Sequence, residues 1–94
     1  MIELKVKSGD LTYETLTDLN IRTGPSSRYP LQPRDQLTDD GRKHSTGSVL
    51  HKNTRVTVLE IIVRPQANSV WIHIPSGYIC GVDGDKKYVK ECYI

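Results

Sequence analysis

The only tryptophan of the chain lies in a segment whose pattern directs its side chain away from an apolar core. In residues 70–74, Trp71 and His73 alternate with three branched apolar residues. Because side chains alternate between the two faces of a β-strand, Trp71 and His73 are predicted to share the outer face. A tryptophan there gives a flat, rigid contact for a peptide or a sugar ring, and His73 can donate a hydrogen bond to a carboxylate. The alternative is structural: Trp71 covers a second small core and His73 is solvated.

A second group of polar and aromatic residues is predicted to face the same ligand. Asn20 and Arg22 alternate with apolar residues in a short strand over 19–22, and a guanidinium binds a carboxylate through two parallel hydrogen bonds. Tyr29 follows the turn after this strand, and Tyr78 follows the turn after the tryptophan strand. We therefore predict a ligand-binding groove lined by aromatic side chains. Each of these four residues also has a structural interpretation, as part of the fold or as a packed side chain.

The sequence gives little support for catalysis. Cys80 and His73 lie in neighbouring segments, so a Cys–His hydrolase pair is conceivable. However, Cys80 lies in an apolar strand, without the helix N-terminus or basic cluster that lowers the pKa of a reactive thiol. The sequence contains neither a glycine-rich phosphate-binding loop nor a paired-carboxylate site. We predict a protein that is not an enzyme and that uses no cofactor.

The two cysteines, Cys80 and Cys92, leave two interpretations open. They lack a Cys-x-x-Cys spacing, and no set of further Cys or His ligands for zinc is evident beside them. They are either small apolar fillers or the two ends of a single disulfide that closes the intervening loop. No metal site is predicted.

Length and charge limit the possible partners. Ninety-four residues make one domain, and a formal net charge of +2 with interspersed signs gives no attraction toward nucleic acid. No segment approaches the ~20 apolar residues that span a bilayer, so no membrane insertion is predicted. Residues 1–7 alternate apolar and charged side chains, which indicates an added strand or a linker over 1–12 rather than a secretion signal.

The pattern predicts an all-β fold. Short strands with turn signals every eight to twelve residues favour a small SH3-like barrel of about five to seven strands. Residues 55–63 form the strongest strand, and its alternation shifts phase near Leu59, as at a bulge or a barrel corner. Residues 31–47 are polar and predict an elongated loop that is either functional or mobile. Its charged residues are able to gate the groove or confer specificity, and the alternative is an ordinary solvated loop. Extra strands are expected at both ends of the chain, with a possible hairpin after Cys80.

Several motifs resemble, in the same order, those of bacterial SH3 (SH3b) domains. The resemblance covers residues 17–79 and is strongest in the first of these motifs: Leu19-Asn20-Ile21-Arg22-Thr23-Gly24-Pro25-Ser26, Gly47-Ser48-Val49-Leu50, Asn53-Thr54-Arg55-Val56-Thr57-Val58-Leu59, Trp71-Ile72-His73-Ile74 and Gly77-Tyr78-Ile79. The chain departs from the family in its long 31–47 loop and its C-terminal end. It also has Tyr78 where the family has a closing tryptophan.

The resemblance implies a non-catalytic module that binds the bacterial cell wall. Such domains target a lytic enzyme, an endolysin or autolysin, to peptidoglycan, and the long loop makes this chain most similar to C-terminal wall-binding domains of phage or bacterial lysins. The expected ligand is a stem or cross-bridge peptide or the glycan, and the expected partner in the parent protein is an N-terminal catalytic domain. The site of action would be the wall, reached outside the cell or after lysis. The alternative is a protein–protein interaction module that binds a Pro-rich or extended peptide.

Overall fold

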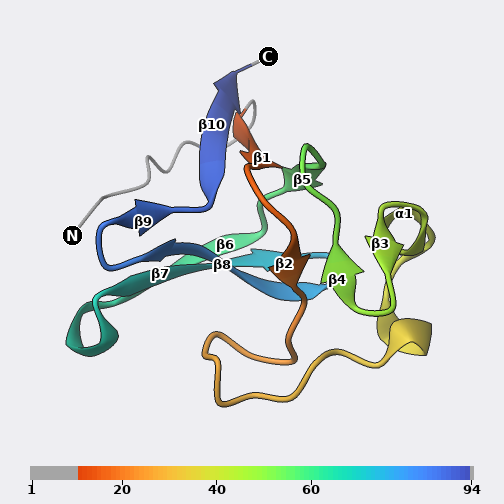
Figure 1. Ribbon diagram of the computed structural model, residues 1–94, viewed down its shortest axis with the longest axis horizontal. Coiled ribbons are helices and arrows are strands. Elements are labelled where there is room, and N and C mark those ends of the chain that lie inside the picture. Colours follow the sequence, from red (N-terminus) through yellow and green to blue (C-terminus); the bar gives the residue numbers. More distant parts are fainter. Residues whose placement is uncertain (1–10, 94) are drawn as a thin grey trace.

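The computed structural model describes residues 11–93 and confirms an all-β fold (Figure 1). The strands are short: β1 (Leu11–Thr15), β2 (Leu19–Asn20), β3 (Ser45–Thr46), β4 (Val49–Leu50), β5 (Arg55–Thr57), β6 (Glu60–Arg64), β7 (Ser69–Ile74), β8 (Gly77–Asp83), β9 (Lys86–Lys87) and β10 (Val89–Tyr93). The helical turns are η1 (Arg34–Gln36), α1 (Asp39–Lys43) and η2 (Pro65–Ala67).

The strands form three small antiparallel sheets rather than a closed barrel. Their orders are β10-β1-β5, β2-β4-β3 and β6-β7-β8-β9. The predicted barrel of five to seven strands is therefore wrong in its closure and its strand number. The physical reason is that most turn signals fall between strands of two to five residues, so the chain changes sheet often and no single sheet is long enough to close on itself.

The predicted corner in the 55–63 strand is confirmed. The segment divides into β5, which pairs with β1, and β6, which pairs with β7. At the break, the exposed fraction of Leu59 is 55 %, whereas Val56 is buried. The phase shift in the sequence thus marks the point where the chain leaves one sheet and enters another.

One main core joins the three sheets. Its buried members are Tyr13, Leu19, Ile21, Leu37, Leu50, Val56, Val70, Ile72, Ile74, Ile79, Val82 and Val89. The register between β7 and β8 shifts at residues 70 and 71, so that Val70 lies opposite Val82 while Trp71 lies opposite Cys80. Gly81 is the extra residue, and this bulge turns Val82 rather than Gly81 toward the core.

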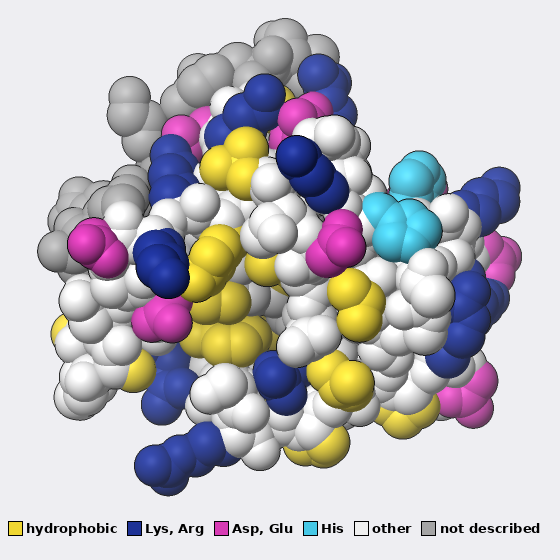
Figure 2. Space-filling model, viewed as in Figure 1, with side chains coloured by type: hydrophobic (Ala, Val, Ile, Leu, Met, Phe, Trp, Pro, Cys, Tyr) yellow, Lys and Arg dark blue, Asp and Glu magenta, His cyan; other side chains and the backbone are white. Residues whose placement is uncertain are grey.

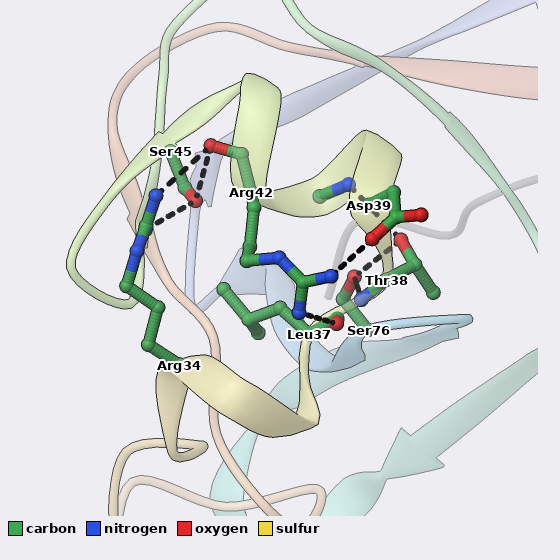
Figure 3. Close-up of polar contacts among 8 residues, drawn as sticks. Arg34, Leu37, Thr38, Asp39, Arg42, Ser45 and Ser76 are labelled. Atoms are coloured by element: carbon green, nitrogen blue, oxygen red, sulfur yellow. Dashed lines mark hydrogen bonds and ion pairs between the residues drawn. The ribbon is translucent and has the colours of Figure 1, made fainter.

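The predicted loop over 31–47 contains η1, α1 and β3, and polar contacts hold these elements together (Figure 3). The Arg34 guanidinium donates to the Ser45 hydroxyl (3.3 Å), the Gly47 carbonyl (2.7 Å) and the Arg42 carbonyl (3.2 Å). The Thr38 hydroxyl caps α1 by accepting from the Gly41 N–H at 3.0 Å. Because α1 has no repeating apolar stripe, the sequence pattern did not reveal it.

The two ends of the chain differ in what the structure shows. The extra C-terminal strands are present: β9 forms a hairpin with β8, and β10 pairs with β1 along its length. The strand predicted over residues 1–7 lies outside the described residues. Within residues 11–93, no helix combines the length and apolar content needed to cross a membrane.

Candidate functional site

A cleft of about 740 Å³ lies beside β2 on the face of β7 and β8 that points away from the main core. Figure 2 shows a hollow on the viewed face, with hydrophobic side chains inside it and charged side chains at its edge. The cleft is lined by three segments: residues 17–20 and 22 with 26–28, the ends of β6 and η2, and β7 with β8 and Tyr88. The lining residues are Thr17, Asp18, Leu19, Asn20, Arg22, Ser26, Ser27, Arg28, Arg64, Ala67, Ser69, Trp71, Cys80, Asp83 and Tyr88.

Trp71 lines the cleft as a recessed residue. It lies opposite Cys80 on β8 and Ile62 on β6, and its neighbours Val70 and Ile72 belong to the main core. The alternation of β7 therefore places Trp71 on the predicted face. Its side chain is nevertheless only 6 % exposed, so a ligand would reach part of the indole ring through the cleft. Trp71 is thus buried on the face opposite the main core.

Three arginines line the cleft near the turn that follows β2. Arg22 Nη1 donates to the carbonyl of Tyr29 at 2.9 Å. Arg64 Nη1, reaching across from β6, donates to the carbonyl of Pro25 at 3.1 Å. Arg28 lies within the same turn. Sequence reasoning found Arg22 but missed Arg28 and Arg64, because neither lies in a recognisable motif and Arg64 meets the turn only through the fold.

The cleft is also lined by Asn20 from β2 and by two acidic side chains, Asp18 and Asp83. Asp18 precedes β2 and accepts a hydrogen bond from the Lys52 N–H at 2.8 Å. Asp83 lies at the end of β8, opposite Ser69. The cleft therefore carries both signs of charge, with the arginines gathered at the turn end.

Three predicted ligand residues do not line this cleft. His73 and Tyr78 are cross-strand partners on β7 and β8, and their rings stack with centroids 4.3 Å apart and an 8° interplanar angle. Tyr78 also pairs with Arg22 through two backbone hydrogen bonds of 2.8 and 2.9 Å. Tyr29 is 46 % exposed, and a Cβ placed on Gly24 would lie 2.6 Å from its ring. Their roles in ligand binding stay predictions, and the cleft's second aromatic residue is Tyr88.

The Cys80 thiol lines the cleft, and its surroundings favour the protonated form. Burial raises its pKa from 9.0 to about 11, the nearby Asp83 carboxylate adds to the rise, and a hydrogen bond to the Val82 carbonyl opposes it. A thiol with this pKa is a poor nucleophile at neutral pH. Cys80 and Cys92 are both free, so the structure has no disulfide between them. Within residues 11–93, no cluster of His, Cys, Asp and Glu is arranged to hold a metal ion.

The segment over 31–47 does not contribute to this cleft. Figure 1 shows α1 and β3 at the opposite side of the molecule from β9. Residues of this segment line a second, smaller cavity of about 310 Å³, which includes Asp40 and His44. A gate over the tryptophan cleft would therefore have to come from elsewhere.

Comparison of the chain with protein-family models, with curated proteins and with solved structures gave no match. The resemblance to SH3b domains consequently rests on the ordered motifs alone.

Proposed function

We propose that this domain is a non-catalytic module that binds the bacterial cell wall and targets a lytic enzyme to peptidoglycan. The ordered SH3b-like motifs support the family, and the tryptophan cleft supports a binding role. The observation that carries the proposal is that one cleft combines an aromatic residue, Trp71, with three arginine side chains. The catalytic partner domain and the action at the wall belong to the same proposal.

The dimensions and chemistry of the cleft suit a segment of wall peptide. Its volume of about 740 Å³ lies within the ~300–1,000 Å³ typical of ligand sites. The indole of Trp71 offers apolar contact, and Asn20 offers both a donor and an acceptor for a peptide group. The Arg22 guanidinium is held by the Tyr29 carbonyl, which orients it without neutralising it.

The same features favour wall peptide over a Pro-rich segment. Recognition of Pro-rich segments uses aromatic rings that line an open groove, whereas Trp71 is 6 % exposed and arginines outnumber aspartates in the cleft lining. The raised pKa of Cys80 argues against the one nucleophile that the sequence offered.

The experiment is retention of the purified domain on purified cell walls. Ser27 is an exposed residue in the cleft lining, so Ser27→Trp should fill the cleft without disturbing the core. Lys43→Trp places the same bulk on an exposed residue of α1 that does not line this cleft and is the matched control.

We expect cell walls to retain the original domain and Lys43→Trp but not Ser27→Trp. Circular dichroism should show that all three proteins are equally folded. Failure of the original domain to bind walls from any tested species would refute wall binding. If Ser27→Trp is still retained on cell walls, the wall-binding site is not in the cleft.

A further inference from the structure

Three arginines line the cleft although they come from separate parts of the chain. Arg22 follows β2, Arg28 lies in the next turn, and Arg64 ends β6. Hydrogen bonds to the carbonyls of Tyr29 (2.9 Å) and Pro25 (3.1 Å) tie the first and third to the same turn. Bringing like charges together is unfavourable unless an anion offsets them.

The described residues provide no such anion. Every ion pair recorded within residues 11–93 involves other cations: Arg42, His44, Arg55, Lys87 and Lys90. Each guanidinium has five N–H donors. Among the described residues, Arg22 and Arg64 each use one donor in a side-chain hydrogen bond, and the Arg28 side chain uses none. The three arginines that line the cleft thus keep many charged donors without a partner among the described residues.

Neither aspartate of the cleft lies in the turn to which the arginines are tied. Asp18 lies before β2, whereas the arginine turn lies after it. Asp83 is two strands away from Arg64 through the register Arg64–Ser69–Asp83, a backbone separation of about 10 Å, and the two side chains form no ion pair. A polyanion that filled the cleft would be repelled by the carboxylates of Asp18 and Asp83. In a short peptide with one carboxylate and one ammonium group, the carboxylate would pair with the arginines and the ammonium with the aspartates.

We infer that the turn end of the cleft is a carboxylate subsite, formed by Arg22, Arg28 and Arg64, that orients a zwitterionic peptide with its amine toward Asp18 and Asp83. This inference rests on the proposed binding role of the cleft and adds the chemistry and direction of its ligand. A bidentate guanidinium–carboxylate contact supplies both the attraction and the orientation.

The test is a fluorescence titration, because Trp71 is the only tryptophan of the chain and lines the cleft. The probes are Nα-acetyl-Lys-D-Ala-D-Ala, its C-terminal amide and its Nε-acetyl form. Inorganic phosphate and a glycerol-phosphate oligomer serve as anions of another class. Arg28→Gln removes the arginine whose side chain has no hydrogen bond or ion pair among the described residues. Arg55→Gln removes an equal charge from an exposed side chain of β5 that lies outside the cleft and pairs with Glu14 at 3.9 Å, and it is the control.

The peptide with both charges should bind best, amidation should weaken binding about fivefold or more, and Nε-acetylation should weaken it less. Arg28→Gln should abolish the preference for the free carboxylate, whereas Arg55→Gln should keep it. Equal binding of the acid and the amide, or tighter binding of the glycerol-phosphate oligomer, would overturn the inference.

The two proposals fail in different ways. If the free-carboxylate peptide binds but purified walls do not, the subsite stands and the wall-binding function is wrong. If walls bind and Arg28→Gln changes neither their retention nor the acid-to-amide ratio, the function stands and the subsite is wrong.

Discussion

Replacement of Gly41 by alanine tests whether the 31–47 segment is a structural element rather than a gate. Gly41 is buried in α1, and a Cβ added there would lie 2.1 Å from the Ser76 hydroxyl oxygen and 3.1 Å from the Ser76 Cβ. That hydroxyl accepts from the Thr38 N–H at 3.1 Å and shares a hydrogen bond with the Thr38 hydroxyl at 3.0 Å. Alanine would therefore force the Ser76 side chain to rotate away from both contacts.

The two effects of the substitution have opposite signs. Two lost hydrogen bonds cost about 1 kcal/mol each, and crowding at the Ser76 Cβ adds about 1 kcal/mol. Alanine gains at most about 1 kcal/mol over glycine in a helix, and α1 has only five residues. The expected result is a loss of about 2 kcal/mol in the free energy of unfolding, or roughly 10 °C in Tm for a domain of this size.

The assay is urea unfolding followed by Trp71 fluorescence, with a double-mutant cycle. In a Ser76→Ala background the clashing oxygen is absent, so Gly41→Ala should cost less than about 1 kcal/mol. Gly47→Ala is the contrasting control: its φ is +60°, and apart from its two chain neighbours no described residue lies within 4 Å of the added Cβ, so only backbone strain of about 1 kcal/mol is expected, independent of Ser76.

An unchanged or raised stability of Gly41→Ala would refute this reasoning. Below its Tm, the variant should bind cleft ligands normally, because α1 does not line the tryptophan cleft. Loss of binding in the folded variant would instead restore the hypothesis of a gating loop.

Three further predictions concern other parts of the domain. The alkylation rate of Cys80, followed by peptide mass spectrometry, should rise with pH to a midpoint near pH 11, and a midpoint near pH 9 would contradict the raised pKa. Because the unfolded thiol ionises near pH 9.0, the free energy of unfolding should fall as the pH rises from about 9 to 11. Thr15→Val should cost about 2 kcal/mol in urea unfolding, because the buried hydroxyl accepts from the Thr54 N–H at 2.9 Å, and Thr15→Ser should retain most of that stability. Arg34→Lys should lower the free energy of unfolding by about 1 kcal/mol, because an ammonium cannot reach all three acceptors within residues 42–47; unchanged stability would show that these exposed bonds contribute nothing.

Much of the strand pattern could be predicted because it is a local property. Alternation placed Trp71 on the face opposite Val70 and Ile72, and the phase shift near Leu59 located the change of sheet. These predictions need only the two-residue period of a strand and the preference of apolar side chains for the core. The same reasoning missed α1, because a helix of five residues held by a cap and polar contacts leaves no apolar period.

The amino-acid pattern alone was enough to predict an all-β chain, the faces of its main strands and a set of candidate ligand-binding residues. Which of those candidate residues lie together became visible only in the folded chain. It kept Asn20, Arg22 and Trp71 in one cleft and added Arg28 and Arg64. The physical reason is the range of the contacts: the hydrogen bond that brings Arg64 to the turn joins residues 39 positions apart. Such a contact depends on the pairing of whole sheets, which no local pattern specifies.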